Sequence, residues 1–484
     1  MKYQTAGNGK AEKKALGMKI AITLVSAFVL AVLIKLSDYL GGGSARDFFT
    51  PKVFTDIAII TALMLGLLAT LIAYAYFTKR ELFKEKKLFP IIYISLILTY
   101  FLCLVFGLLV NLYVVPLMLS GLLVAGLVDR KVGIAVNLLM SQVFFLTYML
   151  VSGGGNIFES ASALITSMVA GIFMIAFMDR AETRLKFIGL GLGVGLATAV
   201  IPILLNLINA YASIEEALMY GLWSFLSSIL AVGLYMLILP VMEYVFKVNT
   251  DFRLAEITSL QFPLLKRLAK EAPGTFNHSL VVGNLSELCA AAIGENPQLA
   301  KAASYYHDVG KIKNPEYFFE NQKGYNPHDD LIPEVSVKMI TSHTGDGYNM
   351  IKKHRLPDII ADVAREHHGT TPANFFLNKA QSLTEDGIEK SEFSYPDPLP
   401  SSKVAAIVMI VDTVEAATRA MSGKITNPKE FREIIHKLIK QKTDLNQFSN
   451  CDITFKDLQI IEDTLVDAVP NMYHARIQYA KTDK

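Results

Sequence analysis

The residues in this sequence that could carry chemistry are histidines and aspartates in the second half of the chain. Seven of the nine histidines lie between residues 278 and 368. His307 is followed by Asp308 in YYHDVGK, and two more histidines, His367 and His368, are adjacent in REHHGTT. Imidazole and carboxylate groups gathered in one domain are typical ligands of transition-metal ions. The composition of this region therefore predicts a metal site.

A further candidate ligand is Asp412, which stands in the apolar segment AAIVMIVDTV. Burying an unpaired carboxylate in such a helix costs several kcal/mol, unless a cation neutralises it or its pKa rises until it takes up a proton. A bound metal ion would meet this requirement. The alternative is a helix whose polar stripe contains Asp412, Thr413 and Glu415 and which needs no metal.

The adjacency of His307 and Asp308 restricts how the two could bind metal. A single His-Asp pair usually lies at the surface or forms a simple hydrogen bond. Successive residues on a helix point about 100° apart, so both side chains reach one ion only near a helix end, or with Asp308 bridging to a second ion. Gly310 follows the first pair closely and Gly369 follows the histidine pair, as is typical of helix ends. The spacing is thus compatible with a site for two metal ions.

The elements that must position these residues are helices. In residues 252–484, apolar side chains recur every three or four positions, for example in HSLVVGNLSELCAAAIG and VAAIVMIVDTVEAATRA. No run alternates as a strand would. The stretches EAPGTFN, GYNPHDDLIP and SEFSYPDPLPSS, rich in Pro, Gly and Asn, mark the loops. We expect an all-α domain here.

The first half of the chain has a different composition. The 484-residue sequence is 52% apolar and only 19% charged, and the apolar excess is concentrated before residue 247. A helix needs about 20 apolar residues to cross a ~30 Å hydrocarbon core. Eight segments are candidate spans, of which the fourth is the shortest: 18–36, 54–77, 89–110, 113–128, 132–151, 160–178, 187–208 and 217–246. The predicted parts are a basic N-terminus, a membrane domain, a linker and a soluble domain: 1–17, 18–246, 247–262 and 263–484.

The basic residues of the loops predict the orientation of these spans. Lys and Arg precede the first span and occur in the loops after the second, fourth and sixth, whereas among the opposite loops only the first carries any. The positive-inside rule then places both the N-terminus and residues 247–484 in the cytoplasm. The first span could instead be a cleavable signal sequence ending near the small residues 41–45, although it is long for a signal core. Either interpretation leaves the C-terminal domain inside.

Composition also argues against several classes of function. No Asp, Glu, Lys or Arg lies deep in a predicted span, which disfavours a transporter or proton pump. Polar residues in the fifth span could line a small polar site, but hydrogen bonding between helices is the preferred interpretation for Asn137, Ser141 and Gln142. A net charge of +2 offers no strong field for a nucleic-acid polymer. The three cysteines lack metal-type spacing, so we expect free thiols and a reducing compartment for the soluble part: Cys103, Cys289 and Cys451.

The order of the motifs resembles a known family. EAPGTFNHSLVVGNLSE, YYHDVGKIKNPEYFFENQ, SHTGDG, REHHGTT and VDTVEAATR follow one another as in the HD domain of the seven-transmembrane-receptor HD phosphohydrolases of the PgpH type. The membrane region is similar in pattern, with one leading span, seven more and then the HD domain. One departure concerns the gap between the first two spans, where such proteins normally carry a large extracellular domain. Here a short loop with the sequence GGGS, natural or engineered, fills that gap.

The resemblance implies a site for two divalent metal ions, and imidazole with carboxylate suits manganese or iron. Asp308 would bridge the two ions. The first ion would also be bound by His278, His307 and Asp412, and the second by His343, His367 and His368.

Other polar residues of the soluble domain have more than one possible role. Lys311, one turn after His307, is either a solvated surface residue or a member of the site, where it would meet a phosphate or hold Asp308. We predict Asp308 and Lys311 as catalytic. His328 is either a loop residue or a contact on the substrate side. The remaining histidines match no ligand motif: His354, His436 and His474.

The function implied is that of a metal-dependent phosphodiesterase anchored in the bacterial cell membrane. It would hydrolyse cyclic di-AMP to linear pApA by attack of a metal-bridging hydroxide on phosphorus. Its partners would be cyclic di-AMP and the lipid bilayer. The chain could also form a homo-oligomer. A rival of another class is a receptor that binds a nucleotide and signals without cleaving it. A neighbouring enzyme class acts on cyclic di-GMP and carries a GYP motif after the paired histidines, which HHGTTPANFF lacks.

Overall fold

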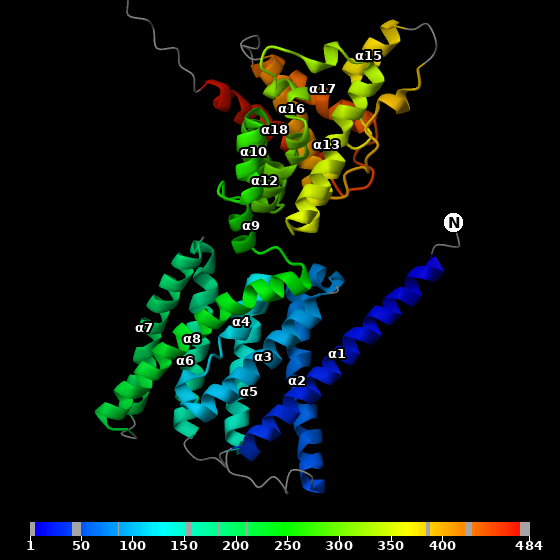
Figure 1. Ribbon diagram of the computed structural model, residues 1–484. Coiled ribbons are helices and arrows are strands. Elements are labelled where there is room, and N and C mark those ends of the chain that lie inside the picture. Colours follow the sequence, from blue (N-terminus) through cyan, green and yellow to red (C-terminus); the bar gives the residue numbers. More distant parts are fainter. Residues whose placement is uncertain are drawn as a thin grey trace, which may run out of the picture. The chain divides into compact units, whose positions relative to one another are not determined.

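The protein is almost wholly helical (Figure 1). The computed structural model describes residues 5–40, 50–85, 87–151, 157–181, 183–208, 212–383, 388–421 and 428–474. Within these ranges there is no strand, and the only β-type pairing is an isolated bridge between Pro372 and Ser394. The chain divides into two compact units, Met1–Phe252 and Arg253–Lys484. The all-α prediction is confirmed for both.

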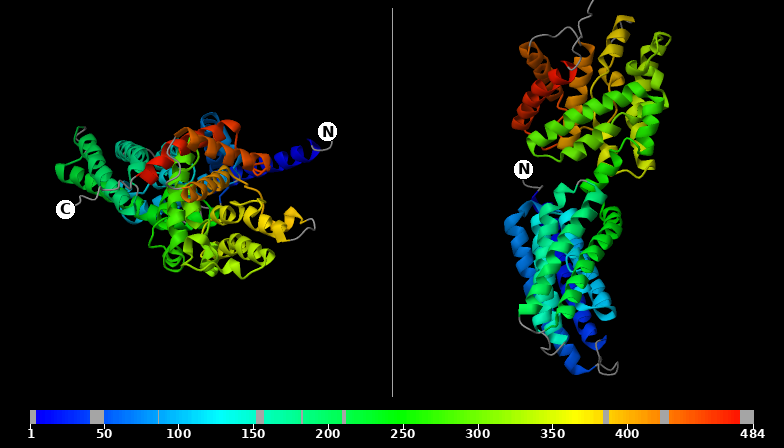
Figure 2. Two further views of the ribbon diagram at one scale, coloured as in Figure 1. Left: turned by 90° about the horizontal axis from the view of Figure 1, so that it is seen from above. Right: turned by 90° about the vertical axis from the view of Figure 1, so that its left-hand side faces the viewer.

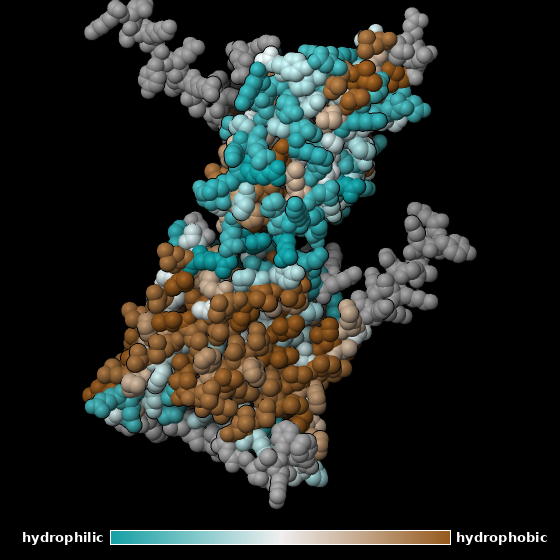
Figure 3. Space-filling view, in the orientation of Figure 1, coloured by the Kyte–Doolittle hydropathy of each residue, from teal (hydrophilic) through white to brown (hydrophobic). Residues whose placement is uncertain are grey.

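The first unit consists of long apolar helices. Seven of its described helices are long and apolar enough to cross a membrane, and Figure 3 shows the hydrophobic surface that they present, in brown. The helices are α1 (Thr5–Leu40), α2 (Pro51–Thr78), α3 (Leu88–Leu109), α4 (Leu119–Leu127), α5 (Arg130–Val151), α6 (Ile157–Phe177), α7 (Arg184–Ile208) and α8 (Ile214–Phe246). The predicted short outer loop with GGGS lies outside the described residues.

The fourth predicted span differs from the other seven because it is not one continuous helix. The segment Leu112–Leu127 contains a short 3₁₀ turn and then α4, which is only about 14 Å long at 1.5 Å per residue. Two ion pairs show at which end of the bundle this segment finishes. Lys79 Nζ lies 3.1 Å from Asp129 Oδ2, and Arg130 Nη1 lies 2.5 Å from Asp179 Oδ2. The loops after α2, α4 and α6 therefore meet at one end of the bundle, so the chain crosses back between α3 and α5.

The irregular backbone before α4 is stabilised by neighbouring helices. The Ser227 hydroxyl of α8 donates a hydrogen bond of 2.7 Å to the carbonyl of Val115, and the Asn111 side chain accepts from the backbone N–H of Tyr113 at 2.9 Å. Nearly every residue of α4 is buried. Non-helical backbone is tolerated at membrane depth where it is enclosed by protein, which explains how so short a helix fits here.

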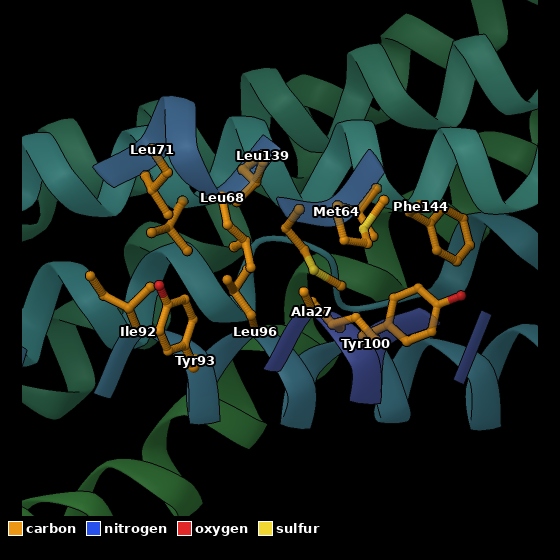
Figure 4. Close-up of a cluster of buried hydrophobic side chains, with 14 of the residues drawn as sticks. Ala27, Met64, Leu68, Leu71, Ile92, Tyr93, Leu96, Tyr100, Leu139 and Phe144 are labelled. Atoms are coloured by element: carbon orange, nitrogen blue, oxygen red, sulfur yellow. The ribbon is translucent and has the colours of Figure 1, made fainter. Parts of the chain in front are cut away.

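Apolar packing holds the bundle together. Figure 4 shows part of a core in which Met64 and Leu68 of α2 meet Leu96 and Tyr100 of α3. Tyr100 is fully buried, and its hydroxyl lies 2.9 Å from the hydroxyl of Thr147. Of the polar residues of α5, Asn137 makes the predicted contact between helices, because it donates to the carbonyl of Met168 in α6 at 3.3 Å. Ser141 instead donates to the carbonyl of Asn137 within its own helix.

The second unit is a bundle of shorter helices, coloured from green to red in both views of Figure 2. They are α9 (Asp251–Ile257), α10 (Pro263–Glu271), α11 (Pro273–Ile293), α12 (Pro297–Tyr306), α13 (Pro333–Lys353), α14 (Asp358–Glu366), α15 (Asn374–Leu383), α16 (Lys403–Ala420), α17 (Pro428–Asp444) and α18 (Phe455–His474). Several begin with proline, whose fixed φ and missing N–H suit the first helical turn. Gly294, at φ 78°, ends α11 in the left-handed conformation.

Helix α16 lies at the centre of this unit. Its residues from Val404 to Asp412 are all buried, and its apolar face packs with α11, α17 and α18 in one core. A second core joins α10, α12 and α14 through residues such as Leu265, Tyr306 and Ile360. These two cores hold α11, α12, α14 and α16 in fixed positions, and the candidate ligands lie on these helices and on α13.

Candidate metal centre

Both adjacent pairs stand where a helix ends. Helix α12 ends at Tyr306, directly before His307 and Asp308, and α14 ends at Glu366, directly before His367 and His368. The predicted helix ends are thus present. His307, Asp308 and His367 are each at most 1% exposed, so the ligand groups lie inside the domain rather than on its surface.

Three buried histidines share one hydrogen-bonding pattern. The Nδ1 atoms of His307, His343 and His367 lie 2.7, 2.6 and 3.0 Å from the carbonyl oxygens of residues 304, 340 and 364. A carbonyl oxygen only accepts, so in each imidazole Nδ1–H donates and Nε2 is left to face the other ligand groups. This is the arrangement by which proteins fix metal-binding imidazoles.

His278 is oriented in the same way by a carboxylate. Its Nδ1 lies 2.5 Å from Glu415 Oε2, and its Nε2 lies 3.0 Å from Asp412 Oδ1. If Nδ1–H donates to Glu415, the lone pair of Nε2 faces a second acceptor. Two acceptors at 3.0 Å repel each other unless a proton or a metal ion lies between them. His278 and Asp412 are therefore suited to share a metal ion.

The two oxygens of Asp308 face two different sets of histidines. Oδ1 lies 3.2 Å from His343 Nε2 and 3.6 Å from His367 Nε2. Oδ2 lies 3.3 Å from His307 Nε2 and 3.6 Å from His278 Nε2. Since a carboxylate can bind one cation through each oxygen, Asp308 has the placement of a bridging ligand.

All seven predicted ligands come together. Three groups have ligand atoms within 4.8 Å of one another: His343, His367 and His368; His278, His307 and Asp412; and His307, Asp308 and His367. Within the described part of the chain, His307 Nε2 and both oxygens of Asp308 are buried, and the contacts of these atoms are ion pairs with neighbouring imidazoles and with Lys311. The Nε2 atoms of His343 and His367 also face each other at 3.3 Å. Buried carboxylate oxygens and imidazole nitrogens that converge in this way favour positive charge between them, so the donor set fits divalent metal.

The electrostatics of the metal-free site agree with this requirement. Burial lowers the pKa of His307, but Asp308 and Asp412 outweigh it and raise that pKa to about 10. Burial raises the pKa of Asp308, but Lys311 and His307 outweigh it and hold that pKa well below its usual range. Burial lowers the pKa of His367 to about 4, and the contact with Asp308 opposes this shift without reversing it. The carboxylates thus stay ionised, and a proton on His307 balances part of their charge.

Lys311 holds Asp308 rather than pointing into open space. Its Nζ lies 2.6 Å from Asp308 Oδ2 and 3.0 Å from Glu320 Oε1, and 4.9 Å from the centre of the Phe318 ring. Of the two alternatives that the sequence left open, this is the contact with the carboxylate. Lys311 nevertheless also lines the cavity of the site.

A cavity of about 210 Å³ opens onto the ligands. Its wall includes His278, His343, His368 and Asp412, together with residues that were not predicted as metal ligands or catalytic groups: Phe318, Glu320, Ile340, Tyr395, Ala416 and Arg419. Glu415 and Arg419 follow Asp412 by three and seven positions, so helical spacing in VDTVEAATR could have indicated them. Tyr395, whose ring centre lies 4.2 Å from that of His368, stands in a proline-rich loop without any local signal.

Three further histidines of the described residues, His328, His354 and His436, do not line this cavity. His328 is buried, its Nε2 lies 2.9 Å from the carbonyl of Tyr317, and its ring packs on Tyr317 and Phe376. It is therefore a loop residue that packs in the interior. His354 contacts the carbonyl of Met350 and His436 contacts Glu462. The side chain of His474 is not among those described.

Comparison with known proteins places both units in families. Residues 54–250 match the family described as 7TM receptor with intracellular HD hydrolase, and residues 275–417 match the HD domain family. The cyclic-di-AMP phosphodiesterase PgpH of Bacillus subtilis is 36% identical over 378 residues, which is 77% of this chain and 52% of that protein. The PgpH protein of Listeria monocytogenes is 38% identical over 318 residues, 64% of this chain and 43% of that protein.

The chain thus spans about half the length of the curated relatives that it matches. The solved HD domain of L. monocytogenes PgpH in complex with cyclic-di-AMP is 44% identical, covers 45% of this chain and 100% of its own, and has a TM-score of 0.42. The two family matches follow each other along the chain in the order of the two units described above. The chain therefore combines a membrane region like that of the 7TM receptors with an intracellular HD hydrolase and, after it, an HD domain.

Proposed function

We propose that this protein is a membrane-anchored phosphodiesterase that hydrolyses cyclic di-AMP to linear pApA. The observation that carries the proposal is the position of Asp308, whose two oxygens face separate sets of histidines at 3.2 to 3.6 Å. Its relatives in B. subtilis and L. monocytogenes are named as cyclic-di-AMP phosphodiesterases, and the ligand set for hydrolysis is complete in this chain.

The site would hold two divalent ions, manganese or iron, with Asp308 between them. One ion would be held by His278, His307 and Asp412, and the other by His343, His367 and His368. When bound, such ions lower the pKa of a water molecule and neutralise phosphate oxygens during in-line displacement. No protein nucleophile is then needed.

The protein's own residues would orient these ligands and bind the substrate. Glu415 accepts the Nδ1–H of His278, and Lys311 fixes Asp308 while it adds positive charge to the cavity wall. Arg419 lines the same cavity, is 38% exposed at its side chain, and has its Nε 3.9 Å from Glu415. A cyclic dinucleotide has two phosphates, so Arg419 is suited to the phosphate that is not being cleaved. Tyr395 and Phe318 offer aromatic faces to a base.

The basic loops that meet at one end of the membrane unit support a cytoplasmic position for the HD domain. The chain leaves that unit at the same end, because Lys87 Nζ donates to the carbonyl of Lys247 at 3.0 Å. The lipid bilayer and cyclic di-AMP would be the partners of the protein.

The test is to incubate the detergent-purified protein with cyclic di-AMP and manganese, and to measure pApA by chromatography. We expect turnover in the intact protein and none in an Asp308→Ala variant. An excess of cyclic di-GMP should compete poorly. Tight binding of cyclic di-AMP without cleavage, by protein shown to contain metal, would contradict the proposal and support a receptor that does not cleave its ligand.

A further inference from the structure

A groove in the membrane unit lies far in sequence from the metal ligands and has no part in the proposed chemistry. It runs between α6 and α7, has a volume of about 790 Å³, and is lined mainly by apolar side chains such as Phe173, Leu190 and Ile201. This is the size of a pocket for a small organic ligand. Its walls belong to helices that are apolar enough to span a bilayer.

Glycines on α7 form the floor of this groove. The segment GLGLGVG places four glycines at alternate positions, and these face two different ways. A Cβ on Gly191 or Gly195 would lie within 3 Å of Val232 or Ser228, so this pair allows α8 to pack closely. A Cβ on Gly189 or Gly193 would have nothing within 4 Å, and both positions line the groove. Close helix packing explains the first pair, whereas the second pair keeps a space open.

Two basic residues stand at one end of the groove. Arg180 and Lys186 line it where the chain passes from α6 to α7, and the guanidinium of Arg180 lies 5.1 Å from the ring centre of Phe177. The nearby Asp179 is paired with Arg130. The groove therefore combines a long apolar part with a positively charged end.

We propose that this groove binds an anionic phospholipid of the surrounding bilayer. From Lys186 to Ile201 the groove follows α7 for about 22 Å at 1.5 Å per residue, which exceeds the ~15 Å depth of one hydrocarbon leaflet. An acyl chain fits along the glycine floor, and the phosphate of the headgroup meets Arg180 and Lys186. Basic pockets between membrane helices are known to suit such headgroups.

The charges argue against a second copy of the chain as the occupant. In a two-fold dimer with its axis along the membrane normal, equivalent residues lie at the same depth. Pairing through this face of α7 would bring Arg180 and Lys186 of each copy close to those of the other. Like charges in contact are destabilising, whereas a phosphate between the helix ends is attracted to both residues.

The probe is a phosphatidylglycerol that carries a photoreactive diazirine on one acyl chain, with the matching phosphatidylcholine for comparison. Each lipid is incorporated into nanodiscs together with the full chain, and the sample is irradiated. The labelled peptides are then mapped by mass spectrometry. We expect labelling concentrated in residues 169–201 and stronger with phosphatidylglycerol. Gly193→Leu should reduce this labelling several-fold because its side chain fills the floor, and Ala197→Leu provides a second groove variant.

The matched control is Gly233→Leu on α8, another exposed glycine with nothing within 4 Å of its Cβ. It should leave the labelling unchanged. Replacing both Arg180 and Lys186 with Gln should lower the preference for phosphatidylglycerol by roughly fivefold for each charge removed. An Arg80→Gln and Lys131→Gln double variant, with exposed residues outside the groove, should keep the preference.

Three results would overturn the proposal. Equal labelling by both lipids would show a general lipid contact instead of a site for anionic lipid. Labelling spread evenly over all exposed helices and insensitive to Gly193→Leu would rule out occupation of the groove. A Gly193→Leu variant that converts a dimer into a monomer, without loss of labelled lipid, would assign this face to a second copy. None of these measurements depends on turnover, so their failure is separate from that of the phosphodiesterase proposal.

Discussion

At the scale of single residues, the site depends on carboxylates that orient histidines. Glu415 is buried and accepts the Nδ1–H of His278, which turns Nε2 toward Asp412 and Asp308. It would not touch a metal ion itself. Its effect on the reaction would therefore pass through the orientation and basicity of His278.

We predict that Glu415→Gln lowers the affinity for manganese by about 10- to 100-fold, the usual effect of losing such a partner. The amide still fits the space but is a weaker acceptor, so His278 is held less firmly. Metal affinity is measured by calorimetric titration of the purified protein. The control is Glu462→Gln, which changes a carboxylate 2.8 Å from the exposed His436. Equal losses in both variants would contradict a specific role for Glu415.

The charge of His307 predicts a pH dependence of metal binding. Its pKa of about 10 in the metal-free domain lies above the ordinary value of 6.5. Its contribution to the stability of that form is thus complete below about pH 6.5 and is lost as the pH rises through about 10. Because a metal ion needs the free lone pair, binding must release this proton.

We therefore expect the apparent affinity for manganese to rise by about tenfold per pH unit for each proton released, between about pH 6.5 and 8.5. Calorimetry in two buffers with different ionisation enthalpies counts the protons directly. An affinity that stays constant over this range, with no proton release, would show that His307 is neutral before the metal binds.

At the scale of elements, the site requires the turn after Asp308 to lie against α13. A Cβ on Gly310 would stand 1.9 Å from the carbonyl oxygen of His343 and 2.6 Å from the backbone nitrogen of Gly347. Only glycine permits this approach. The contact sets the distance between Asp308 on one element and His343 on the other.

We predict that Gly310→Ala destabilises the domain by about 1 to 3 kcal/mol, the usual cost of forcing extra atoms into a packed interior, and lowers the metal content. Thermal unfolding and elemental analysis measure the two effects. Gly345→Ala is the matched control on α13, because its Cβ would have nothing within 4 Å. That change should be neutral, or stabilising by up to about 1 kcal/mol. Normal metal content in Gly310→Ala would contradict the proposed coupling.

At the scale of the whole molecule, the course of α4 decides the topology. Eight crossings place the two ends of the membrane unit on one side, and a bundle without the crossing at α4 would place them on opposite sides. The ion pairs of Asp129 with Lys79 and of Arg130 with Asp179 support eight crossings.

We expect Ser213→Cys, in the loop before α8, to react with a membrane-impermeant maleimide in intact cells. Lys131→Cys, at the start of α5, should react only after the cells are made permeable. Both are made in a chain whose three native cysteines have been replaced. Labelling of Lys131→Cys from outside would contradict both the crossing at α4 and a cytoplasmic HD domain.

Much of this molecule could be predicted from its sequence. The long apolar runs indicated the membrane helices, and the three-to-four spacing indicated an all-helical second unit, because both signals arise between residues close in the chain. The motifs YYHDVGK, REHHGTT and VDTVEAATR contain five of the seven residues that the structure brings together, and the resemblance to the HD family added His278 and His343. The helix ends at residues 306 and 366 were likewise indicated by the glycines that follow.

Only the tertiary structure decided how these groups face one another. His278 meets Glu415 across 137 positions of sequence, and Tyr395 reaches His368 from a loop with no local pattern. It also showed that Lys311 holds Asp308, that each oxygen of Asp308 faces its own histidines, and that a broken segment carries the chain back at α4. Hydrophobic period and residue type are local properties, whereas the direction of a side chain at a site depends on how distant helices pack, which no short stretch of sequence contains.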